Sequence, residues 1–217
     1  MALAFQVAGA ANANATSVTI SGMVIAGNAN RVLWIFTFDT NLETPTVTWN
    51  GEDAGAAVET GTYDSATDGW RMYRMLLPTA TTADVVATFT TTGQKSIVAF
   101  VYDDVNQSDP EDAIDEAEGA GTALQNTVAS ATGDICILVA RAVGTTTMTE
   151  ASGETERSDV GTGAARLYEL AGGASLSFDV TLGTSRTWVA LGMNINAGGA
   201  GTAVKDIIGG GIIPGPR

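Results

Sequence analysis

Histidine is absent from the 217-residue chain, which limits the chemistry open to it. Without imidazole there can be no Ser-His-Asp or Cys-His catalytic unit, no histidine general base, and no zinc or iron site built on imidazole. Cys136 is the only cysteine, so no intrachain disulfide and no thiolate metal cluster can form. It lies in the apolar run Ile135–Val139, which predicts a buried side chain rather than a reactive thiol.

Carboxylates are the remaining candidates for acid–base chemistry, and they are concentrated between Asp103 and Glu118. This segment has eight acidic residues and no basic one, and Pro110 interrupts it. A glycosidase on a β-sandwich would place its acids at alternate positions of a strand that lines a cleft. We therefore predict a solvated surface loop here. In a carboxylate enzyme, Asp104 and Glu111 would be the residues to test.

A calcium site in the same segment is the main alternative to a solvated loop. Asp104, Asn106 and Ser108 alternate as in a calcium-binding loop, but Asp109 stands where that motif has glycine. Neither a Gly-x-Ser-x-Gly nor a Gly-x4-Gly-Lys-Ser/Thr motif occurs elsewhere in the chain. We expect a protein without catalytic residues, bound cofactor or metal.

Sugar binding would need exposed, coplanar aromatic side chains with polar neighbours. Trp70 and Tyr73, close to Asp68 and Gly69, are the best candidates for such a platform. Core packing is the favoured interpretation of both, because the tryptophans lie in or beside apolar strands. A carbohydrate-binding module of a tail fibre or cell surface stays open as an alternative function.

The charge balance argues against nucleic acids and anionic membranes as partners. Ten Lys and Arg residues against 24 Asp and Glu give a formal net charge of −14, which repels phosphates and acidic headgroups. The first fifteen residues lack the basic start and unbroken apolar run of a signal peptide. Apolar runs also stay below the ~18 residues of a membrane-spanning helix. These features indicate a soluble protein that is made in the cytoplasm.

Short β-branched runs separated by Gly, Asn, Asp and Ser are typical of strands and turns, and no segment has helical periodicity. An all-β fold with two antiparallel sheets packed as a sandwich is therefore predicted. The predicted strands are Ser17–Ile20, Arg31–Phe38, Thr44–Trp49, Trp70–Leu77, Asp84–Thr91, Ser96–Asp103, Ala123–Ala129, Asp134–Ala142, Ala164–Leu170, Ser175–Leu182 and Thr187–Asn194.

Three of these strands are apolar on both faces: Val32–Phe36, Ile97–Val101 and Ile135–Ala140. They should be central strands with extra cover, either from loops of the same chain or from a neighbouring subunit. Asn50-Gly51 predicts a tight hairpin, because both residues tolerate a positive φ.

The two ends differ in composition from the middle. Residues 1–15 are rich in Ala and Asn and uncharged, whereas residues 197–217 are rich in Gly and carry paired isoleucines. We predict three parts: an N-terminal arm (1–15), a sandwich domain (16–196) and a Gly-rich C-terminal arm (197–217). Both arms are expected to dock on other subunits, since glycine disfavours independent folding and isoleucine disfavours water. The expected interface residues are Phe5, Val7, Ile207, Ile208, Ile212 and Ile213.

The order of several segments resembles a jelly-roll-like β-sandwich module found in structural proteins of tailed bacteriophages. The resemblance covers residues 17–196, and its motifs are structural. They are Val47–Gly51, Trp70–Pro78, Ser96–Val101 followed by Val105–Pro110, and Trp188–Met193.

The resemblance implies a capsid decoration, or cement, protein that stabilises the capsid lattice and sits on the capsid surface of the virion. It implies the major capsid protein and further copies of the chain, as a homotrimer, as partners. The mechanism implied is multivalent attachment to a lattice without turnover.

Overall fold

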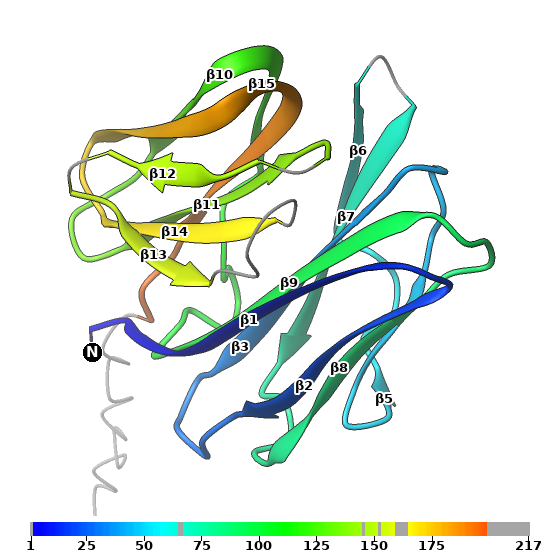
Figure 1. Cartoon of the computed structure of the whole chain (residues 1–217). Helices are drawn as coiled ribbons and strands as arrows, with labels where there is room; N and C mark the ends of the chain where they lie inside the picture. The colour runs from blue at the N-terminus through cyan, green and yellow to red at the C-terminus, as the bar shows by residue number, and fades with distance from the viewer. Residues whose placement is uncertain (1, 65–66, 145, 152, 159–164, 199–217) are drawn as a thin grey trace, which may run out of the picture.

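The computed structural model describes residues 2–64, 67–144, 146–151, 153–158 and 165–198. All regular structure in them is β-strand, in three antiparallel sheets (Figure 1). The predicted all-β antiparallel sandwich class is confirmed, with three sheets where two were predicted. None of the described residues forms a helix long and apolar enough to cross a membrane.

The central sheet contains five strands and lies between the other two sheets. Its strand order is β1-β9-β3-β7-β6, and each neighbouring pair is antiparallel. The strands are β1 (Ala4–Asn14), β9 (Gln94–Asp103), β3 (Val32–Asp39), β7 (Asp68–Leu76) and β6 (Glu59–Tyr63).

One face of the central sheet is covered by a four-stranded sheet of order β2-β8-β4-β5. Its strands are β2 (Ser17–Val24), β8 (Thr82–Thr88), β4 (Thr46–Trp49) and β5 (Glu52–Asp53). The predicted Asn50-Gly51 turn joins β4 to β5 and is confirmed, since both residues have positive φ (51° and 78°).

The other face is covered by a sheet of order β10-β15-β11-β14-β13, with β12 also paired to β15. Its strands are β10 (Asp115–Ala129), β15 (Ser175–Ile195), β11 (Ile135–Ala142), β14 (Arg166–Ala171), β13 (Thr155–Ser158) and β12 (Met148–Glu150). The two predicted strands at Ser175–Leu182 and Thr187–Asn194 are one continuous strand, β15.

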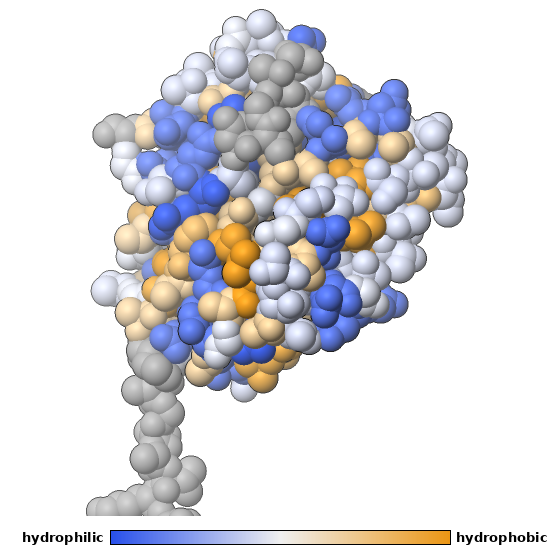
Figure 2. Space-filling model, turned by 60° about the horizontal axis from the view of Figure 1, so that its bottom comes forward, coloured by the Kyte–Doolittle hydropathy of each residue, from blue (hydrophilic) through white to orange (hydrophobic). Residues whose placement is uncertain are grey.

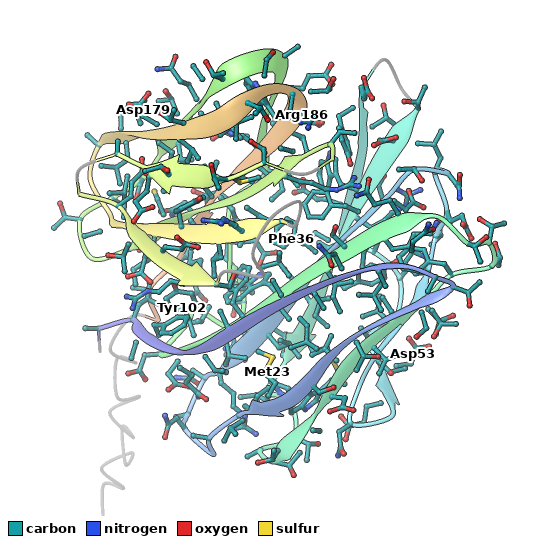
Figure 3. All side chains as sticks on the ribbon, viewed as in Figure 1. Met23, Phe36, Asp53, Tyr102, Asp179 and Arg186 are labelled. Atoms are coloured by element: carbon teal, nitrogen blue, oxygen red, sulfur yellow. The ribbon has the colours of Figure 1, made fainter. Side chains whose placement is uncertain are left out.

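Alternation along β3 explains why the central sheet needs cover on both sides. Trp34 and Phe36 pack in a cluster with β11 and β15, whereas Leu33 and Ile35 pack in a cluster with β2, β4 and β8. Figure 3 places Phe36 toward the β10–β15 sheet and Met23 on the β2 side. The predicted extra cover is therefore a further sheet of the same chain.

Long strands supply cover for the outer face of the β10–β15 sheet as well. The first part of β15 and the last part of β10 fold over β11 and β14 and enclose a third apolar cluster around Leu138 and Phe178. The register shifts between Gly121 and Ala123, where Gly121 has φ 137°, a value that favours glycine. This irregularity lets one pair of strands contribute to two layers.

The N-terminal segment differs from the arm that was predicted. Ala4–Asn14 forms β1 and pairs with the whole of β9, from Ala4 with Asp103 to Asn14 with Gln94. It is thus an edge strand of the chain's own central sheet. Four shorter strands, β5, β6, β12 and β13, were not predicted, and Asp115–Glu118 begins β10 instead of belonging to a loop.

Substitutions on the two faces of the central sheet test the three-layer arrangement. Phe100→Ala leaves a cavity in the apolar interlayer between the central sheet and the β10–β15 sheet. Ile35→Ala leaves a cavity in the interlayer between the central sheet and the β2–β8 sheet. Both side chains are fully buried. We expect each to lower the free energy of unfolding by about 2–5 kcal/mol, whereas exposed Thr19→Ala should change it by about 0.5 kcal/mol or less. Urea unfolding measures all three. A loss below about 1 kcal/mol in either core variant would contradict burial of that face.

Candidate functional site

Two of the six predicted interface residues lie in the described structure, and both make contacts within the chain. Phe5 packs edge-on against Tyr102, with ring centroids 5.5 Å apart, and belongs to the rim of the first core cluster. Val7 packs on the second cluster. Ile207, Ile208, Ile212 and Ile213 lie outside the described residues.

An ion pair and an aromatic contact fix the start of β1 to the β10–β15 sheet. The guanidinium carbon of Arg157 lies 4.4 Å from the centre of the Phe5 ring, and Arg157 donates to both carboxylate oxygens of Glu169 (2.8 and 2.7 Å). Tyr102 donates its hydroxyl proton to the same carboxylate. Burial, followed by the charge of Glu169, raises the pKa of Tyr102 well above its usual range.

Some carboxylates of the acidic segment that begins at Asp103 accept structural hydrogen bonds. Glu111 accepts from the Trp34 indole (2.8 Å) and pairs with Arg74, and burial raises the pKa of this carboxyl. Glu116 accepts from the Trp70 indole (3.0 Å). Both carboxylates satisfy buried tryptophan donors. The prediction of a solvated loop is wrong for Glu111, whose side chain is 5% exposed, whereas Glu116 is exposed but belongs to β10 instead of a loop.

The calcium alternative finds no cluster of acidic ligands in the described part of the chain. No group of three or more His, Cys, Asp or Glu side chains there could hold a metal ion. Asn106 Oδ1 instead accepts from the backbone N–H of Ser108 (3.1 Å) and Asp109 (3.4 Å), which is a local turn.

The proposed sugar platform is excluded by the positions of its residues. Trp70 and Tyr73 are 3% and 1% exposed, and they belong to different core clusters on opposite faces of β7. Their interpretation as core residues is confirmed. The other tryptophans and tyrosines offer no substitute, since none of them is more than 8% exposed.

A shallow hollow of about 240 Å³ lies where the β6–β7 turn approaches β10 and β15. It is lined by Asp64, Glu118, Gly119, Ala120 and Thr187. Small-molecule pockets are usually larger, about 300–1,000 Å³, and mostly apolar with aromatic walls. The described residues that line the hollow include neither a nucleophile paired with a base nor an aromatic side chain.

Two of the buried cations, Lys95 and Arg141, lie close to acidic side chains inside the layers. Lys95 donates to Glu43 (2.7 Å) and lies 3.8 Å from Asp39. Its hydrogen bond, together with those from Thr90 and Thr91, holds the pKa of Glu43 well below its usual range. This network joins the chain around Glu43 to the β8–β9 turn, which is a structural role.

Arg141, the second buried cation, was missed by the sequence analysis, although an arginine within the apolar run of β11 was a visible signal. Its guanidinium carbon lies 5.7 and 5.6 Å from the ring centres of Phe38 and Tyr63. Its Nη1 lies 3.6 Å from Asp68 Oδ2, beyond hydrogen-bond distance. Burial lowers the pKa of Arg141 to about 10 and raises that of Asp68 to about 6.

The two ends of the described chain meet at one corner of the central sheet. Ala4 pairs with Asp103, and the next carbonyl, that of Asp104, accepts from the Gly198 N–H (2.6 Å) (Figure 1). An isolated bridge between Val105 and Ala197 supports the same contact. The first residues of β1 and the residues that follow β15 therefore lie side by side.

Among the described residues, large exposed apolar side chains are few and lie on several elements. They are Val24, Leu42, Val58, Leu76 and Leu77. Figure 2 shows the apolar side chains of one face as small patches separated by polar ones. Broad apolar patches are the usual mark of a large protein interface, and the coloured part of this face shows none.

No family model, curated protein or solved structure matches this chain. The resemblance to phage virion proteins therefore depends on the sequence motifs alone.

The buried Asp68 carboxyl predicts a pH dependence of stability. Because folding favours its protonated form, stability falls as pH rises between its ordinary pKa of 3.8 and about 6. Asp68→Asn cannot ionise. We therefore expect the stability of the natural protein relative to this variant to fall by about 1–3 kcal/mol from pH 4 to pH 7. Urea unfolding of both proteins at the two pH values measures this difference, and a difference that rises with pH would contradict the prediction.

Proposed function

We propose that the chain is a structural protein of a virus particle, which binds the outside of the capsid lattice and stabilises it. Its partner is the major capsid protein and its place is the capsid surface. The role is binding without turnover. The proposal extends the family resemblance with the geometry of the described residues.

The observation that carries the proposal is the corner formed by Ala4, Asp103, Asp104 and Gly198. The Gly-rich segment with its paired isoleucines continues from Gly198, so it is attached at this corner of a rigid three-layer body. A rigid body with an apolar attachment segment suits a repeating lattice, because each added contact is made at high effective concentration.

The chemistry of the described residues agrees with a binding role. Several of their carboxylates accept from tryptophan indoles or pair with buried cations, as Glu111, Glu116 and Glu43 do. A catalytic carboxylate would instead face a cleft with access to substrate. These contacts give the body rigidity, which reduces the ordering cost of attachment.

Quantitative mass spectrometry of purified particles from the source culture tests the proposal. We expect this chain in a ratio to the major shell protein that is near one-to-one or a simple fraction of it, because decoration follows the lattice. A few copies per particle would indicate a tail or fibre protein instead. Absence from the particles would overturn the proposal.

The attachment segment is tested by a chain that ends at Gly198. We expect this shortened chain to keep the unfolding midpoint of the full chain but to lose binding to particles stripped of the natural protein. Trimming before Thr16 is unsuitable, because it removes β1 from the central sheet. A second variant keeps the full length but replaces the paired isoleucines, with Ile207→Ser, Ile208→Ser, Ile212→Ser and Ile213→Ser. It separates the effect of the isoleucines from that of chain length. If both variants bind as the natural chain does, the segment is not the attachment.

A further inference from the structure

The strand β1 is an edge of the central sheet. Among the described strands it has one hydrogen-bonded neighbour, β9, and it stands at the end of the order β1-β9-β3-β7-β6 (Figure 1). An edge strand presents unpaired N–H and C=O groups along its outer side, which can template pairing with another strand.

β1 lacks the features that natural edge strands use to prevent such pairing. Its sequence, AFQVAGAANAN, contains no charged residue and no proline. Its one register shift lies between Phe5 and Val7, and the eight residues from Val7 to Asn14 then pair with β9 without a break. An uninterrupted, uncharged edge of this length is open to a further strand.

Other edge strands of the described structure are protected in recognisable ways. β13 is four residues long, carries Glu156 and Arg157, and has a register shift between Glu156 and Ser158. β6 is five residues long and begins with Glu59, and β5 has two acidic residues. β2 is uncharged, but a register shift between Ile20 and Met23 interrupts it. β10 carries Asp115, Glu116 and Glu118, with a further register shift after Gly121.

Both apolar interlayers reach β1 and are incompletely closed there. Side chains on one face of the segment, including Phe5 and Ala10, are partly buried against the first core cluster. Those on the other face, including Val7 and Ala11, are partly buried against the second. A strand added beside β1 would continue both layers and remove apolar surface from water, at roughly 25 cal/mol per Å² before ordering costs.

We propose that β1 pairs with β1 of a second copy of this chain, antiparallel and about a two-fold axis, so that two central sheets become one. The occupant is a second copy because the arrangement is self-complementary: identical strands related by a two-fold axis are antiparallel, as all strand pairs among the described residues are. This pairing also brings two chains, each of net charge −14, together at a strand that has no charged residue.

The pairing is independent of binding to a capsid, so the two proposals can fail separately. A two-fold pair also differs from the homotrimer that the family resemblance implies. Sedimentation equilibrium of the full chain over a range of concentrations distinguishes these states. We expect a reversible species of twice the 22.1 kDa chain mass. A monomer at all concentrations, or a trimer, overturns the inference.

Charge added to the edge tests which surface pairs. Asn12 and Asn14 are exposed residues of β1, so Asn12→Asp with Asn14→Asp adds charge without entering the core. We expect at least tenfold weaker dimerisation. The matched control, Thr19→Asp with Thr82→Asp, adds the same charge at exposed positions of the outer β2–β8 pair. Equal weakening by both variants would indicate a general charge effect and overturn the assignment to β1.

Two proline variants give a second, backbone-based test. Adjacent strand residues direct their N–H groups to opposite sides, so one of Ala10→Pro and Ala11→Pro loses a bond to β9 and the other loses an outward N–H. The variant with the higher melting temperature should be monomeric. The chain that ends at Gly198 should still dimerise. A dimer that survives in the more stable proline variant, or that disappears on removal of residues 199–217, contradicts pairing through β1.

Discussion

Burial of the central sheet on both faces is the constraint on which the rest of the structure depends. β3 is buried along its whole length, so a two-layer sandwich would leave one of its apolar faces in water. Two further sheets remove both faces from water, and the hydrophobic gain scales with the area covered. The β10–β15 sheet then has an outer face of its own, which the long strands β10 and β15 cover by folding back over it.

The sequence predicted the strands whose residues themselves favour strands, and it missed those that depend on partners distant in the chain. Val, Ile and Phe runs identify β3 and β9. The segment that forms β1 consists mainly of Ala, Asn and Gly, which have weak strand propensity, and it is a strand because β9, some ninety residues later, pairs with it. The need for extra cover was visible in the doubly apolar runs. The segments that supply this cover were not visible in the sequence, because contacts between distant residues decide which segments cover a sheet.

For the candidate site too, some features could be predicted from the sequence and others depend on contacts between distant residues. The absence of histidine excludes catalytic units and metal sites built on imidazole, and this conclusion follows from composition alone. Spacing could not show that Glu111 and Glu116 accept from Trp34 and Trp70, because each pair joins segments far apart in the sequence. A buried indole N–H needs an acceptor, and acidic residues beside the sheet provide it. Acidic residues that looked like a solvated loop are therefore partly the polar complement of the core.

Burial of apolar surface favours association as well as folding. At β1 the two interlayers end in partly buried side chains, and the chain has neither charge nor proline there to stop the sheet. A net charge of −14 repels a second copy over the molecule as a whole, so association needs a surface where approach brings no further like charges together. An uncharged edge meets this requirement and offers main-chain hydrogen bonds with a defined direction. The edge strand that completes the central sheet is thus also the place where that sheet can grow.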